Sequence, residues 1–143
     1  MTVNRLTEGR GVLAVRIDGV ASTDDAGQGA IANPEGVDVL ILRGTLVVHT
    51  ASTGAANISI GVAADNETAA TDLINALAMN GVDAQTAYNC HAMQNTAKTA
   101  ITAPALWTST SYVTITGSAS LAGLEATLFL EYLRVDEPAA DEF

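Results

Sequence analysis

Apolar and polar residues alternate with a period of two along most of this chain. Val, Ile and Thr are concentrated in short runs that are separated by clusters of Gly, Asn, Asp and Ser. Alternation of this kind places successive side chains on opposite faces of a β-strand, whereas a helix has a period of about 3.6 residues. The clearest runs are residues 12–17, 57–62, 111–116 and 124–135. The pattern predicts an all-β protein.

The last of these runs also predicts which of its faces is buried. The face that carries Leu124, Leu128 and Tyr132 is more apolar than the face that carries Glu125 and Glu131. We therefore expect the first face to pack on the core. Less regular apolar runs predict two further strands, at 88–93 and 96–102.

The segment 37–50 is too long and too apolar for one ordinary strand. It predicts a pair of strands, and Gly44 predicts a bulge or bend within it. A turn at 51–55 leads into the run at 57–62, which predicts a hairpin. Residues 21–35 are rich in Gly, Asp and Ala, so they predict a long loop.

One segment, residues 69–79, has a helical period. The apolar residues that share one stripe of it are Leu73, Ile74, Leu77 and Ala78. This stripe predicts one or two turns of helix. Thr68 is a suitable N-terminal cap and Asn80-Gly81 a suitable end.

The predicted strands number seven or eight, which fits a two-sheet β-sandwich, of the jelly-roll type, with one short helix. A chain of 143 residues is long enough for one domain with its own core. We expect an N-terminal arm at 1–10, the sandwich at 11–135 and an acidic, solvated tail at 136–143.

The charge composition excludes two classes of partner. Asp and Glu outnumber Lys and Arg by 16 to 6, so the net charge is −10, and Lys98 is the only lysine. Such a chain cannot neutralise many phosphates, so we expect no nucleic acid and no anionic membrane as partners. No apolar run approaches the roughly 20 residues of a membrane span. The N-terminal residues lack the apolar segment of a secretory signal, so we expect synthesis in a cytoplasm.

Charged residues are unevenly distributed. Residues 84–124 form a stretch of 41 residues with one charged side chain, Lys98. Thr, Ser, Asn and Gln are frequent in this uncharged segment, together with Tyr88, Trp107 and Tyr112. Loss of charge with retention of polar and aromatic residues is typical of surface that is buried against another protein. We therefore expect a homo-oligomeric interface here, and the alternative is a Thr- and Ser-rich surface that faces water.

No pattern for catalysis stands out. The sequence has no Gly-x-Ser-x-Gly, His-Glu-x-x-His, Walker or Gly-x-Gly-x-x-Gly motif. Nothing positions the two histidines, His49 and His91, in a catalytic triad, so we do not expect an enzyme. Cys90, the only cysteine, precedes His91. Adjacent strand residues point to opposite faces, so these two side chains do not share a metal ion.

Two loops and one aromatic residue offer possible binding groups. Asp24-Asp25 and Asp65-Asn66-Glu67 supply oxygen ligands, but neither has the spacing of a calcium loop, so we expect solvated turns. Trp107 offers a ring for a sugar to stack on, although a lone Trp is more often a core or interface anchor. No metal and no cofactor are expected.

A resemblance gives a more specific hypothesis. In the segment from Thr53 to Ala63, a turn leads into a strand that ends in Gly-Val-Ala, and Asp65 to Thr68 and Asp72 to Leu77 form a short excursion. This resembles a pattern in small β-rich virion proteins of tailed viruses. The resemblance implies a jelly-roll capsid decoration or cement protein, often trimeric, on the outer face of the major capsid protein shell. It implies no catalytic residue.

On this hypothesis the chain contacts itself, as a homotrimer, and the major capsid protein on the outer surface of the virion. The residues that we expect at these interfaces are Arg5, Arg10, Tyr88, His91, Lys98, Trp107 and Tyr112. The alternative is a carbohydrate- or receptor-binding β-sandwich of a virion fibre or spike, in which Trp107, Tyr88 and Tyr112 form the platform.

Overall fold

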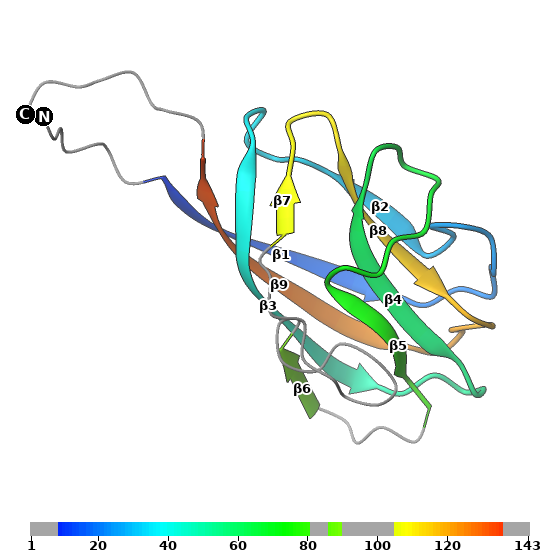
Figure 1. Ribbon diagram of the computed structural model, residues 1–143. Coiled ribbons are helices and arrows are strands. Elements are labelled where there is room, and N and C mark those ends of the chain that lie inside the picture. Colours follow the sequence, from blue (N-terminus) through cyan, green and yellow to red (C-terminus); the bar gives the residue numbers. More distant parts are fainter. Residues whose placement is uncertain (1–8, 81–85, 90–104, 136–143) are drawn as a thin grey trace, which may run out of the picture.

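The computed structural model describes residues 9–80, 86–89 and 105–135 (Figure 1). These residues contain nine strands and no helix, which confirms the predicted all-β class. The strands are β1 (Arg10–Asp18), β2 (Gly29–Ala32), β3 (Val39–Thr50), β4 (Asn57–Ala63), β5 (Ile74–Ala78), β6 (Thr86–Asn89), β7 (Ala105–Trp107), β8 (Tyr112–Gly117) and β9 (Glu125–Arg134).

The strands form two antiparallel sheets. Sheet A has the order β1-β9-β3-β6, with β7 also paired to β3, and sheet B has the order β2-β8-β4-β5. One apolar cluster contains residues of both sheets, so the sheets pack face to face. Leu46 of sheet A and Ile58 of sheet B, for example, have no exposed surface. This arrangement agrees with the predicted two-sheet architecture.

Strand β9 shows how the alternation produces the core. Its inward residues are almost completely buried, and they are Ala126, Leu128, Leu130 and Tyr132. The residues between them lie on the outer face of sheet A. The prediction of which face of this segment is buried is therefore confirmed.

The long apolar segment forms a single strand instead of the predicted pair. Strand β3 is 12 residues long and pairs with β9 along one side, while β7 and then β6 pair with its other side. Its pairing with β9 is irregular at two places, between Ile41 and Arg43 and between Val48 and Thr50, and the first lies two residues before the predicted position, Gly44. Gly44 lies opposite Leu130 in regular pairing. The strand can be this long because it is covered on both edges.

The predicted hairpin at 51–55 is wrong, because β3 belongs to sheet A and β4 to sheet B. The connection between them carries the chain from one sheet to the other. Its backbone is fixed by a hydrogen bond from the N–H of Ser52 to the carbonyl of Met79. A local turn signal cannot distinguish a hairpin from such a crossing.

The predicted helix at 69–79 is also wrong, because this segment contains β5. The pairing of β5 with β4 is irregular between Ile58 and Ile60, and Ala76 has a positive φ of 56°. The irregularity lets Ile74 and Leu77, three residues apart, both face the core. This is the spacing that a helix would give, so the sequence pattern indicated the wrong element.

Two short strands were not predicted. Strand β2 lies inside the expected loop at 21–35, and β7 lies before the expected strand at 109–116. Strand β6 overlaps the predicted strand at 88–93 at Tyr88 and Asn89. The predicted strand at 96–102, the tail at 136–143 and all of the arm but its last two residues fall outside the described residues. Arg10 is the first residue of β1 rather than part of an arm.

Candidate interaction surface

The outer face of sheet A carries most of the large apolar side chains that remain exposed. Among the described residues, six such side chains are at least 38 % exposed. Four of them lie on strands of this sheet, and we call this group the open face. It consists of Val12 on β1, Leu42 on β3, Leu106 on β7 and Phe129 on β9. Clustered exposed apolar side chains mark a surface that contacts another molecule.

The strand register connects these residues across the sheet. Phe129 lies between Ala14 of β1 and Thr45 of β3. In the next outward row, Val12 lies opposite Glu131. The row formed by Ala14, Phe129 and Thr45 therefore contains small or apolar side chains and no charged one.

The bulge in β3 shapes the middle of the open face. It turns both Leu42 and Arg43 outward, and the Arg43 Nε donates a hydrogen bond to the Glu131 Oε2 at 2.5 Å. Beside this ion pair lies a shallow hollow of about 290 Å³, lined by Arg10, Leu42, Arg43 and Glu131. An apolar side chain of a partner would find here both an apolar wall and polar groups at its rim.

The outer face of sheet B is covered by the chain itself. The loop between β4 and β5 folds back over Gly61, so that a side chain at this position would meet Asp72 Oδ1 at 2.1 Å and the backbone of Ala70 at 2.7 Å. The Asp72 carboxylate accepts a hydrogen bond from the N–H of Val62 at 2.7 Å. Thr114, on the neighbouring strand, is completely buried. This face therefore offers less surface to a partner.

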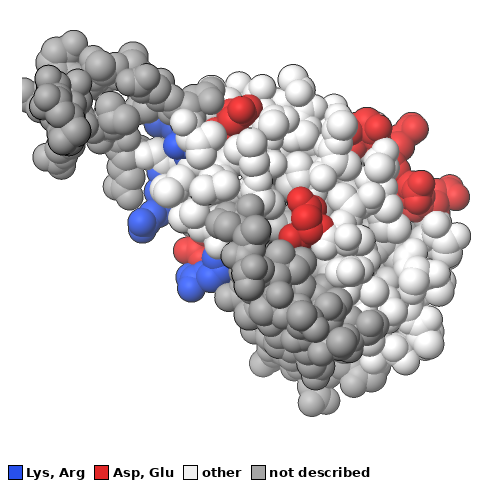
Figure 2. Space-filling view, in the orientation of Figure 1, with Lys and Arg blue, Asp and Glu red and all other residues white. Residues whose placement is uncertain are grey.

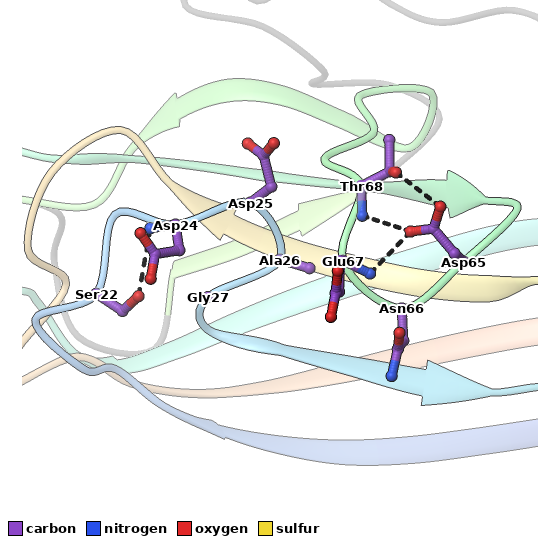
Figure 3. Close-up of a pocket in the computed structure, with 9 residues that line it drawn as sticks. All are labelled: Ser22, Asp24, Asp25, Ala26, Gly27, Asp65, Asn66, Glu67 and Thr68. Carbon is purple, nitrogen blue, oxygen red and sulfur yellow. Dashed lines mark hydrogen bonds between the residues drawn. The ribbon is translucent and has the colours of Figure 1, made fainter.

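The two acidic loops, treated separately in the sequence, come together at one end of the molecule. They line a hollow of about 620 Å³, which Figure 3 shows in close-up. Both Asp65 oxygens accept hydrogen bonds from its own loop, from the N–H groups of Glu67 and Thr68 and from the Thr68 hydroxyl. These bonds, led by the one from the Glu67 N–H, hold the pKa of Asp65 below its ordinary value.

This acidic hollow is not built as a metal centre. In Figure 3 the carboxylates of Asp24, Asp25 and Glu67 point in different directions. No group of three His, Cys, Asp or Glu in the described part of the chain could hold a metal ion. The expectation of solvated turns stays a prediction.

The charged residues mark the two ends of the molecule. Figure 2 shows, on one face of the molecule, basic side chains near the start of β1, a group of carboxylates at the opposite end and separate acidic patches on the otherwise uncharged surface between them. Arg10 and Arg134 belong to the first end, and the acidic hollow to the second.

Of the predicted interface residues, those that the structure describes do not form one group. Arg10 lines the hollow of the open face, whereas Tyr112 is half-buried on β8 of sheet B. Tyr88 pairs through its backbone with Leu46 on β3. The remaining three, Arg5, His91 and Lys98, lie outside the described residues.

Trp107 is a core residue. Its side chain has no exposed surface, and its indole N–H donates a hydrogen bond to the carbonyl of Ser111 at 3.0 Å. A buried ring with a satisfied N–H cannot stack on a sugar or contact another chain without rearrangement of the core. The three-residue aromatic platform of the carbohydrate hypothesis is therefore not formed.

Burial inside the chain explains much of the uncharged segment. Between residues 105 and 124, two polar residues, Ser111 and Thr114, are at most 7 % exposed. Strand β8 is an inner strand of sheet B, between β2 and β4. At the buried positions of β7 and β8 charge is therefore missing because these positions are buried in the monomer, whereas Ser109, Thr110 and Ser118 are exposed and uncharged. The expectation of an interface in the uncharged segment stays a prediction.

Sequence reasoning missed the open face. Val12 and Phe129 stand on the strand faces that are opposite to the core, which is where polar residues are expected. Apolar residues on both faces of β1 and β9 were the available signal. Leu42 could not be assigned, because its exposure depends on the bulge.

No catalytic arrangement forms around His49. It lies near the end of β3, as expected, and its Nε2 is 2.9 Å from the Thr127 hydroxyl. Thr127 is the one hydrogen-bond partner that the structure shows for this ring among the described residues. A base paired only with a surface hydroxyl lacks the orienting carboxylate of a triad.

In comparisons with known proteins, the sequence matches no family model and no curated protein. The fold and the open face therefore define the class: an all-β protein with two antiparallel sheets and an exposed apolar surface on one of them. No helix in the described residues is long and apolar enough to cross a membrane.

Proposed function

We propose that this chain is a structural protein of a viral particle, a capsid decoration or cement protein, and that its sheets have jelly-roll connectivity. The observation that carries the functional part is the open face, where apolar side chains of four strands remain exposed. A protein that covers a shell must bury surface against other polypeptides and needs no reaction centre.

The strand pairing supports the jelly-roll arrangement. Four nested antiparallel pairs occur, namely β1 with β9, β2 with β8, β3 with β6 and β7, and β4 with β5. Alternate pairs belong to alternate sheets, and the sheets are completed by β9 with β3 and by β8 with β4. A long two-stranded ribbon wrapped in this way is the arrangement of jelly rolls, which occur in viral capsid and lectin domains.

The chemistry of the open face favours a polypeptide partner. Val12, Leu106 and Phe129 offer apolar area without an enclosed pocket, and the Arg43–Glu131 pair supplies polar contacts beside them. A sugar ring would instead need an exposed aromatic platform, and Trp107 is buried. The major capsid protein is the proposed partner, and the outer surface of the virion is the proposed location.

Co-sedimentation with assembled capsid shells of the virus that encodes the chain tests this function. The wild-type protein should sediment with shells and not bind unassembled capsid subunits. Phe129→Ser and Val12→Ser should weaken shell binding by about ten-fold or more, because both remove apolar area from the contact. Val20→Ser is the matched control, because Val20 is 45 % exposed but lies outside the open face.

Two results would contradict the proposal. One is a wild-type protein that does not sediment with shells at micromolar concentration. The other is equal binding by Phe129→Ser and wild type, with both folded. A glycan array in which the wild type binds a sugar and Tyr112→Ala does not would favour the carbohydrate-binding alternative.

A further inference from the structure

Among the described strands, β1 is the longest one with an edge that no other described strand covers. It has nine residues, all in regular pairing with β9, and no other described strand pairs with its second edge. The other edge strands are short or broken: β2 and β6 have four residues, β7 has three, and β5 is interrupted at Ala76. Proteins usually protect long edges with charged side chains, Pro or a bulge. Strand β1 has no Pro and no bulge, and its charged residues, Arg10, Arg16 and Asp18, lie toward its two ends.

The hydrogen bonds that flank β1 show which backbone groups point to the free edge. The carbonyl of Gly9 accepts from the N–H of Arg134, and the N–H of Gly19 donates to the carbonyl of Leu124, each at 2.8 Å. Odd-numbered residues therefore bond to β9. Because successive residues of an antiparallel strand bond to opposite sides, even-numbered residues present their N–H and C=O groups to the free edge.

The side chains of these even-numbered residues are also exposed. They lie on the same outer face as the open face, and they are Arg10, Val12, Ala14, Arg16 and Asp18. A basic residue thus begins the strand and an acidic residue ends it, with Ala14 at its centre. If a two-fold axis passes through the centre of this strand, the basic end of one copy lies beside the acidic end of the other copy.

We propose that β1 pairs with β1 of a second copy of this chain, antiparallel and with the two-fold axis at Ala14. In this register all nine residues of each strand are paired, and Arg10 of each copy lies opposite Asp18 of the other. Val12 lies opposite Arg16, and the small Ala14 side chains meet on the axis. Opposite charges in directly facing positions stabilise a strand pair. The Asp18 carboxylate already accepts a hydrogen bond from the Arg16 Nε of its own strand at 2.9 Å, and in the pair it would have a second cationic neighbour, Arg10 of the other copy.

Neighbouring registers are less favourable. An axis at Leu13 would place Arg10 opposite Arg16 twice, and an axis at Arg16 would bring the two Arg16 side chains together. Either shift would also leave residues at the strand ends unpaired. An axis at Val15 would bring no like charges together, but it would place Asp18 opposite Val12 and leave Arg10 and Gly11 without a partner on the other strand. The axis at Ala14 is therefore the one that pairs every residue and also places opposite charges face to face.

Pairing of two β1 strands would bury more of the sheet edge and join the two open faces. Leu13 and Val15 face the core but are only half-buried at this edge, and a second copy would cover them further. The two open faces would become one continuous surface, because Val12 and Phe129 lie on the same side of the sheet. An isologous contact closes at two copies, so the geometry gives a dimer in place of the trimer that the resemblance implies.

Cysteine crosslinking tests the register directly. In a Cys90→Ser background, Ala14→Cys places two cysteines on the axis, with Cα atoms about 5.5 Å apart, which is within disulfide range. Val12→Cys is the matched control, because its two copies would be four residues apart along the pair, or about 14 Å. We expect rapid disulfide dimers of Ala14→Cys and none of Val12→Cys.

Light scattering of the wild-type chain gives the second measurement. We expect twice the 14.6 kDa chain mass at high protein concentration in moderate salt, which screens the repulsion between two chains of −10. Ala14→Pro removes an N–H that points to the free edge and none that bonds to β9. It should weaken association by about ten-fold or more while the far-ultraviolet spectrum stays unchanged.

A charge exchange identifies the facing residues. Arg10→Asp and Asp18→Arg should each weaken association, because each places like charges opposite one another, and the double variant should restore it. A wild-type monomer at millimolar concentration would overturn the proposal, as would a disulfide in Val12→Cys as fast as in Ala14→Cys. Neither readout involves shells, so this result is independent of the proposed function.

Discussion

The outer faces of the two sheets differ in how far the chain itself covers them. Sheet B is covered by its own β4–β5 loop, which requires glycine at position 61 and anchors itself through Asp72. Sheet A has no such cover among the described residues, and Val12 and Phe129 remain exposed. The two inner faces are equally apolar, so the alternation along the strands does not reveal this difference. The difference lies in the loops, and in our proposal sheet A is the face that contacts another chain.

The largest expected effect comes from adjacent residues on opposite faces of β9. Leu128 has no exposed surface, whereas Phe129 is 38 % exposed. Leu128→Ala should lower the free energy of unfolding by about 3–4 kcal/mol, because it removes a core side chain and leaves a cavity. Phe129→Ala should lower it by about 1 kcal/mol or less, because the ring is only partly removed from water. Urea unfolding of both variants measures the contrast.

Equal losses for the two variants would contradict the open face. They would mean that Phe129 is packed as tightly as Leu128, which requires a cover over sheet A. A double variant checks independence of the two faces. Its loss should equal the sum of the single losses within about 0.5 kcal/mol, if the two side chains do not contact.

The second prediction concerns the cover of sheet B. Gly61→Ala should lower the free energy of unfolding by about 2–3 kcal/mol, because the new Cβ would meet backbone atoms of Ala70 and Thr71 at 2.7 Å. Gly54→Ala is the control, since nothing lies within 4 Å of a Cβ at Gly54. Denaturant midpoints measured at equal protein concentration give the comparison. A neutral Gly61→Ala would show that the loop does not rest on this strand.

These two faces also show how much the sequence could predict. The alternation located β1, β4, β8 and β9 and the buried face of β9, because each of these strands has a clear inward set of apolar residues. The segment around Ala76 was misassigned, because a bulge gives apolar residues the same spacing as a helix turn.

The candidate surface was less predictable than the fold. The uncharged segment was taken as an interface, but Trp107 and Thr114 are buried in the monomer. Exposure depends on which strands become inner strands and on which loops cover them, and both are tertiary properties. The proximity of Asp24 to Asp65 across 41 residues of sequence likewise follows from the sheet order and from no local pattern.

The third prediction uses the pH dependence of Tyr132 on the inner face of sheet A. This side chain is 5 % exposed, and its hydroxyl donates a hydrogen bond to Glu35. Burial, and then the bond to Glu35, raise the pKa of Tyr132 to about 12 from 10.0. The unfolded chain therefore loses this proton first as the pH rises, so stability falls between about pH 10 and 12.

Comparison of the wild type with Tyr132→Phe isolates this loss of stability at high pH. At pH 8 the wild type should be more stable, because the variant lacks the hydrogen bond to Glu35. Between pH 10 and 12 the difference between the two proteins should shrink by roughly 2 kcal/mol, because phenylalanine has no proton to lose. Urea unfolding across this range measures it. A constant difference would show that Tyr132 is as accessible to water as in the unfolded chain.

The smallest expected effect on stability comes from the Arg43–Glu131 ion pair of the open face. The side chains are 58 % and 38 % exposed, and pairs in such contact with water contribute little. Arg43→Gln and Glu131→Gln, combined in a double-mutant cycle, should give a coupling energy of about 0.5 kcal/mol or less. A coupling above about 2 kcal/mol would mean that the pair is shielded from water, since desolvation strengthens the attraction between opposite charges. The same cycle measured on the bound protein should give a larger coupling than on the free monomer, because a partner on this face would remove that water. The coupling energy of the ion pair therefore reports whether the outer face of sheet A is exposed to water in the monomer and covered in the assembly.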